Sequence, residues 1–81
     1  MILWIAKDEY DAPVSTEICT EEPTFKLVPE EGVAKANRKL SINGGGKRMI
    51  VRDDQLKDLF GLEPLKSGEK RCIRVTVEEV R

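Results

Sequence analysis

The sequence predicts a small, mainly β (α+β) domain, built as an antiparallel sheet or a partly open barrel. Three observations support this fold class. Five or six short segments are rich in β-branched and aromatic residues or alternate between apolar and polar side chains. Only one segment has helical periodicity, and it precedes the last strand-like segment. The connections are too short for parallel crossovers, so neighbouring strands are expected to be antiparallel.

The whole chain, residues 1–81, is expected to form a single domain. A chain of this length buries only roughly 60–65% of the surface that it exposes when unfolded. Hydrophobic residues make up 40% and charged residues 36%. This composition favours one modest packed core over disorder.

The first half of the chain contains three predicted strands. Residues 2–7 form an apolar run, typical of a strand buried on both faces or covered by a partner. Residues 14–18 alternate between apolar and polar side chains, which predicts a half-buried strand. A third short strand is expected around 25–27, and residues 30–38, which have no clear period, are expected to form a loop.

The second half predicts a hairpin, a helix and a last strand. Residues 39–43 and 47–52 flank an Asn-Gly-Gly-Gly turn, whose residues accept positive φ, so these two segments are expected to pair. One short helix is predicted at about 54–60, with Asp53 or Asp54 as its cap and Gly61 at its end. Residues 73–78 alternate most clearly and predict the final strand.

The sequence offers no catalytic constellation. It has no histidine, which removes the commonest general base and metal ligand. Cys19 and Cys72 lie in alternating strands and are expected to be buried, inert thiols. Gly44-Gly45-Gly46-Lys47 is followed by arginine and a strand, unlike a phosphate-binding loop. We therefore expect a protein that is not an enzyme and that uses no cofactor or metal.

The apolar start of the chain does not resemble a membrane or export segment. Its six apolar residues are too few to span a bilayer, and the charged start and cleavage site of a signal peptide are missing. The sequence therefore predicts a cytoplasmic protein without a membrane partner.

Charge is distributed unevenly along the chain. Residues 1–31 carry eight carboxylates against two lysines, whereas residues 32–57 carry seven basic groups against two carboxylates. The candidate residues for binding an anion or a partner lie in the predicted hairpin and are Lys39, Arg48 and Arg52, flanked by Arg38 and Lys47. Cations on edge strands also prevent aggregation, and this hairpin lacks the aromatic residues of nucleic-acid-binding sheets. Nucleic-acid binding is thus an alternative that is not favoured.

Two further surfaces are candidates for contact with a protein. Ile2 and Trp4 lie on one face of the first strand, opposite to Leu3 and Ile5, and are candidates for self-association. The acidic residues of the first third favour a solubilising surface, and the alternative is a surface that imitates a phosphate backbone and inhibits a host protein; they are Glu17, Glu21, Glu22, Glu30 and Glu31.

Several segments carry a resemblance to other proteins. They are Leu3-Trp4-Ile5-Ala6-Lys7-Asp8, the Glu-Glu-Pro turn at 21–23, Leu59-Phe60-Gly61 to Leu65 and the Gly68-Glu69 turn. With them the chain resembles short uncharacterised proteins of bacterial genomes, phages and mobile elements, which implies an accessory or host-interaction role. The sequence as a whole predicts a small non-enzymatic module that binds another protein or its own copy. Nucleic-acid binding and inhibition of a host protein are the alternatives.

Overall fold

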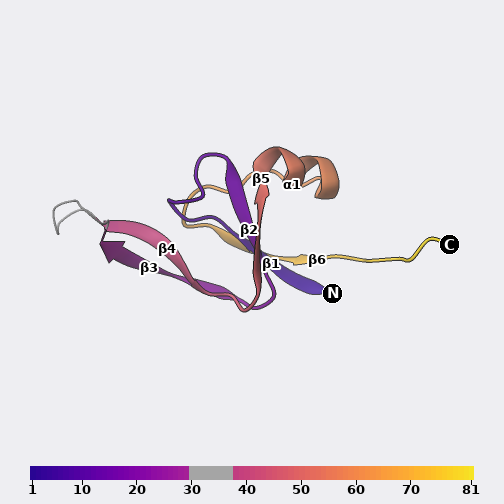
Figure 1. Cartoon of the computed structure of the whole chain (residues 1–81), viewed down its shortest axis with the longest axis horizontal. Coiled ribbons are helices and arrows are strands. Elements are labelled where there is room, and N and C mark those ends of the chain that lie inside the picture. Colours follow the sequence, from indigo (N-terminus) through magenta and orange to yellow (C-terminus); the bar gives the residue numbers. More distant parts are fainter. Residues whose placement is uncertain (30–37) are drawn as a thin grey trace.

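The computed structural model describes residues 1–29 and 38–81. In this part of the chain the elements are β1 (Ile2–Ala6), β2 (Ser15–Cys19), β3 (Pro23–Pro29), β4 (Arg38–Gly44), β5 (Arg48–Arg52), α1 (Asp53–Phe60) and β6 (Lys70–Arg74). They form two antiparallel sheets that do not close into a barrel (Figure 1). The predicted fold class is thus confirmed.

The larger sheet has the strand order β5-β2-β1-β6, with every neighbouring pair antiparallel. The apolar run at the start of the chain becomes β1, one of the two central strands of this sheet. A central position suits a strand whose two faces are both apolar. Ile5 of β1 lies opposite Ile18 of β2, and Trp4 lies opposite Cys19. Successive side chains point to opposite faces, so these two pairs belong to different faces of the sheet.

The hydrophobic core lies on the face that α1 covers, which we call the core face. Ile5 and Ile18 pack there against Leu56 of α1 and against Leu65 from the following connection. Full burial of such a side chain stabilises the fold by roughly 1.5–3 kcal/mol. A helix of eight residues cannot persist alone, so this packing holds α1 in place. Gly61 ends it at φ 66°, and its N–H donates to the carbonyl oxygen of Lys57.

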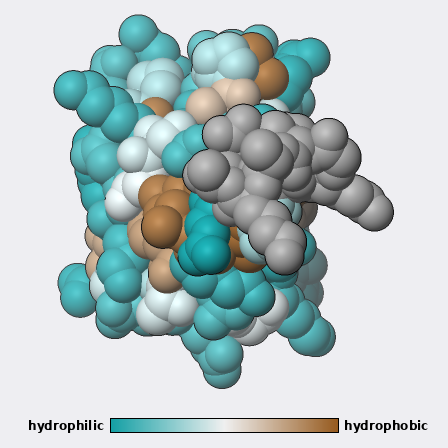
Figure 2. Space-filling model, turned by 90° about the vertical axis from the view of Figure 1, so that its left-hand side faces the viewer, coloured by the Kyte–Doolittle hydropathy of each residue, from teal (hydrophilic) through white to brown (hydrophobic). Residues whose placement is uncertain are grey.

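The opposite, outer face of the sheet carries the second sheet, a hairpin of β3 and β4 that we call the arm (Figure 1). Arg48 and Lys70, both on the outer face, donate to arm carbonyl oxygens, those of Ile42 at 3.3 Å and of Pro23 at 2.9 Å. The base of the arm therefore packs over the middle of this face. Figure 2 looks onto the arm end, where the visible surface is mostly hydrophilic, with an apolar area beside the grey residues.

This packing corrects the prediction that the second strand is half-buried. Glu17 and Cys19 of β2 lie on the outer face, yet both are buried. The alternation of β2 predicted only the face that meets the core, and the arm covers the other one.

The predicted hairpin of residues 39–43 with 47–52 is wrong. These segments do form β4 and β5, but β4 pairs with β3 and β5 pairs with β2. Positive φ angles at Gly44, Gly45 and Gly46 let the chain turn out of one sheet and into the other. The glycine turn was recognised correctly, and only the strands that it joins were assigned to the wrong partners.

The last strand begins and ends earlier than predicted, at Lys70–Arg74 in place of residues 73–78. β6 ends at Arg74. The next residue, Val75, still exchanges backbone hydrogen bonds with Met1, the residue before β1. Residues 75–81 continue from β6 as an extended segment without regular secondary structure (Figure 1). Within the described residues, no helix has the length and apolar character that crossing a membrane requires.

Candidate functional site

The structure does not assemble the predicted basic residues into one surface. Arg38 and Lys39 lie in β4 of the arm, Lys47 lies in the turn that follows, and Arg48 and Arg52 lie in β5. The Lys39 ammonium lies 5.4 Å from the centroid of the Tyr10 ring. Since β4 and β5 belong to different sheets, the cations are distributed between the arm and the large sheet.

Arg48 and Arg52 share the outer face with Trp4 and Ile2. The register shows this, because Arg48 lies opposite Cys19 and Cys19 lies opposite Trp4. Arg48 is occupied by the Ile42 carbonyl and by Glu17, whose carboxylate is 3.6 Å away. Arg48 therefore helps to hold the arm, whereas the exposed Arg52 pairs with its neighbour Asp54 at 3.1 Å.

The two candidates for self-association lie at the part of the outer face that the arm leaves open. Ile2 is 50% exposed, and Trp4 is half-buried. The Lys70 ammonium lies 5.9 Å from the centroid of the Trp4 ring. Cys72 lies opposite Trp4 on the same face and is exposed, which corrects the prediction that both cysteines are buried.

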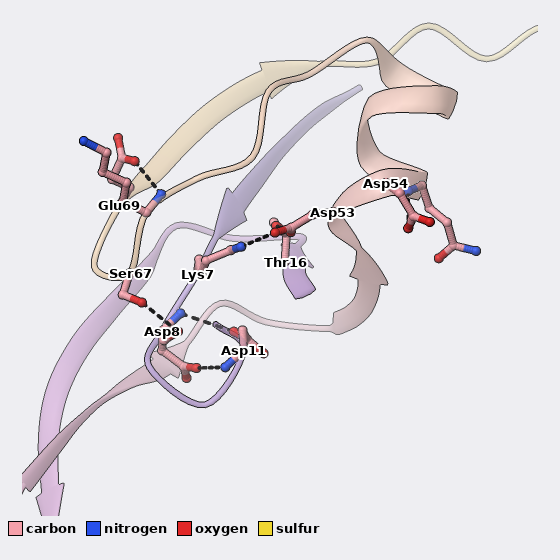
Figure 3. A network of polar contacts seen from close by, with 10 residues as sticks. Lys7, Asp8, Asp11, Thr16, Asp53, Asp54, Ser67 and Glu69 are labelled. Carbon is pink, nitrogen blue, oxygen red and sulfur yellow. Dashed lines mark hydrogen bonds and ion pairs between the residues drawn. The ribbon is translucent and has the colours of Figure 1, made fainter. Parts of the chain in front are cut away.

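Sequence reasoning missed a cluster of buried carboxylates beneath the arm. Asp8, Asp11 and Glu17 each place an oxygen within 4.8 Å of the others. Asp8 accepts backbone N–H groups from Tyr10, Asp11 and Ile42, each at 2.9 Å. The bond from Ile42 joins this loop to the arm, and Asp11 in turn accepts the Asp8 N–H at 3.2 Å (Figure 3).

A shared proton explains how three carboxyl groups can lie so close together. Burial, acting together with the hydrogen bond to Glu17 and the negative charge of Glu17, raises the pKa of Asp11 to about 8. At neutral pH Asp11 is therefore uncharged and donates to Glu17, which also faces Arg48. The cluster has the oxygen ligands that a hard cation would use, yet each member already has a protein partner. We interpret it as the joint that fixes the arm to the sheet.

Part of this cluster has a local sequence signal and part does not. Asp8 precedes Asp11 by three residues in a turn, a spacing typical of side-chain-to-backbone turns. Glu17 occupies the polar position of an alternating strand and was expected on an acidic surface. Its burial depends on the arm, so the predicted acidic surface keeps the exposed Glu21 and Glu22 but not Glu17. Glu30 and Glu31 lie outside the described residues.

A second polar contact joins α1 to the core face. The ammonium of Lys7, only 3% exposed, pairs with Asp53, which also accepts the Thr16 hydroxyl at 2.8 Å (Figure 3). Asp53 or Asp54 was expected to cap the helix, but the N-cap residue is Arg52, whose backbone N–H donates to the side chain of Gln55. Asp53 instead neutralises a buried lysine, because an unpaired charge in this position would be costly.

An open pocket lies at the core-face side of β6. It has a volume of about 340 Å³ and is lined by Leu59, Phe60, Leu62, Ile73, Arg74, Val75 and Thr76. Leu59 of α1 is 71% exposed beside it. Apolar side chains of α1 and polar groups of the segment after β6 thus meet at this edge of the sheet.

Comparison with protein-family models, with curated proteins and with solved structures found no match to this chain.

Proposed function

We propose that this chain is a non-enzymatic protein-interaction module, which binds a protein through the open edges of its four-stranded sheet. The observation that carries the proposal is the strand order β5-β2-β1-β6, which leaves β5 and β6 without an outer neighbour among the described residues. An open edge strand offers unpaired N–H and C=O groups, to which a strand of another chain can add.

Apolar side chains at both edges support the proposal. Met49 and Ile50 of β5 are 59% and 64% exposed. On the β6 side, Phe60 and Leu59 are exposed next to the pocket. An interface of this kind combines backbone hydrogen bonds with pockets for alternate side chains.

The nucleic-acid alternative has less support from the geometry. Arg48 serves the arm joint, and Arg38 and Lys39 lie in a different sheet from Arg52. A titration with single-stranded and duplex oligonucleotides at several salt concentrations tests this alternative. Binding that falls steeply with salt would favour it over protein binding.

Site-specific photo-crosslinking in the cells that produce the chain tests the proposed function. A photoreactive residue replaces Ile50 at the β5 edge or Thr76 beyond β6, and Lys26 on the arm serves as the control position. We expect crosslinks to a partner protein, which is either a different chain or a further copy of this one, at one or both edge positions. Crosslinking at the control position should be weaker. Absence of any crosslinked protein at both edges, or equal crosslinking at Lys26, would contradict the proposal.

A further inference from the structure

β6 has an unpaired outer edge in the described part of the chain. On its inner side, Val75 and Met1 exchange two backbone hydrogen bonds, of 2.9 and 3.0 Å. Antiparallel pairs alternate between hydrogen-bonded and non-hydrogen-bonded positions, so the odd-numbered residues of β6 bond to β1. The even-numbered ones, among them Arg74 and Thr76, therefore direct their N–H and C=O groups away from the sheet.

The segment after β6 has the side-chain pattern of a strand. Val75 and Val77 alternate with Thr76 and Glu78, and the segment runs on in an extended conformation (Figure 1). Val77 is 74% exposed. In the described structure no strand lies beside residues 76–81, so both β6 and this segment lack a neighbour on the same side.

We propose that a second copy of this chain is that neighbour, with residues 69–81 of the two copies pairing antiparallel about a two-fold axis at Val75. This inference rests on the proposed function, because it names the partner and the edge. A two-fold interface must be complementary to itself, and the sequence of this segment meets that condition. The pairing would join two four-stranded sheets into one sheet of eight strands.

Charge and apolar pairing select this register. On the core face the facing pairs are Glu69–Arg81, Arg71–Glu79, Ile73–Val77 and Val75–Val75, and on the outer face they are Lys70–Val80, Cys72–Glu78 and Arg74–Thr76. Opposite charges thus face each other at both ends, around an uninterrupted apolar centre. Even-numbered residues also meet even-numbered ones, so the outward N–H and C=O groups find partners.

Neighbouring registers lose this complementarity. Moving the axis to Thr76 sets Arg71 opposite Arg81, and moving it to Arg74 sets Arg74 opposite its own copy. Like charges directly opposite each other destabilise a strand pair. The register at Val75 is free of such pairs over residues 69–81.

The pocket beside β6 gives the second copy a place for an apolar side chain. In the proposed register Val77 of the second copy lies opposite Ile73, which lines the pocket together with Leu59 and Phe60. These odd-numbered pairs are the non-hydrogen-bonded ones, at which facing side chains approach most closely. Association would therefore cover exposed apolar groups of α1 and of the segment after β6.

Charge reversal at the Arg71–Glu79 pair tests the register with the full chain. Both residues are exposed, with side chains 47% and 74% accessible, so either reversal should leave the fold intact. We expect light scattering and analytical ultracentrifugation to show a dimer for the parent chain. Arg71→Glu and Glu79→Arg should each weaken it by about tenfold or more, because each places two like-charged pairs in the dimer. Lys26→Glu on the arm is the control and should leave the dimer unchanged.

Mixing the two reversed variants separates this interface from any other. A heterodimer of Arg71→Glu with Glu79→Arg contains two attractive pairs again, so mixing should restore dimers that neither variant forms alone. A parent chain that stays monomeric at its highest attainable concentration would overturn the inference. A dimer that is insensitive to both reversals would overturn it too. Edge crosslinks to a different protein would in either case leave the proposed function standing, whereas the absence of any edge crosslink would remove both.

Discussion

Replacing Asp11 by asparagine should make this protein more stable at neutral and alkaline pH. The pKa of Asp11 is about 8 in the folded chain, against an ordinary value of 3.8. The folded state therefore keeps a proton that the unfolded chain loses above about pH 4. The stability from this proton is complete below about pH 4 and is lost as the pH rises to about 8.

The magnitude follows from the difference in bound protons. Within this window, each pH unit lowers the free energy of unfolding by about 1.4 kcal/mol, so the loss from pH 5 to pH 7 is roughly 2–3 kcal/mol. Asparagine can accept the Asp8 N–H and donate to Glu17 without a proton to lose. Asp11→Asn should therefore match the parent below about pH 4, and its advantage over the parent should grow by roughly 2–3 kcal/mol between pH 5 and pH 7.

Urea denaturation of both chains at a series of pH values measures this effect. The other carboxyl groups titrate in both chains. Their contribution therefore drops out of the difference in unfolding free energy between parent and Asp11→Asn. The exposed Asp58 provides a matched control, because Asp58→Asn should follow the pH dependence of the parent. A difference between parent and Asp11→Asn that is the same at pH 5 and at pH 7 would refute the shared proton at the arm joint.

Three further outcomes follow from burial and backbone geometry. Leu56→Ala should lower the unfolding free energy by about 2–5 kcal/mol, since this side chain is fully buried in the core, whereas Leu59→Ala should cost less than about 0.5 kcal/mol. In the folded chain a thiol reagent should label Cys72 rapidly and leave Cys19 unlabelled until urea is added. Burial shields the Cys19 thiol and raises its pKa. Mass spectrometry after digestion measures the labelling of both cysteines. Gly46→Ala should cost at least about 1 kcal/mol in urea denaturation, because φ is 68° and an added Cβ would overlap a side-chain hydroxyl of the β2–β3 turn.

Much of the secondary structure was predictable because it depends on local pattern. The apolar run at 2–7 became β1, one of the two central strands, and the helix predicted at about 54–60 became α1 (Asp53–Phe60). The turn at Gly44–Gly46 has the positive φ angles that its glycines suggested. In each case the structure depends on backbone propensity and on the spacing of apolar side chains, both of which can be read from a few consecutive residues.

Strand partners could not be predicted in the same way. β4 and β5 are neighbours along the chain, and the short glycine-rich loop that joins them favoured a hairpin. β3 instead offers β4 a ladder from Pro23–Gly44 to Pro29–Arg38, and β2 takes β5. A single strand pattern fits many partners, so the choice between them depends on how whole sheets pack.

Local sequence pattern was enough to predict the fold class and the order and type of the elements. Three features depend on how distant segments pack: the burial of Glu17, the separation of the predicted cations between two sheets, and the bond from the arm to Asp8. The physical reason is distance along the chain. The hydrogen bond between Asp8 and Ile42 joins groups 34 residues apart. The alternation of apolar and polar residues along a strand indicates which one of its faces is buried. The other face becomes buried only when a segment distant in the sequence packs onto it.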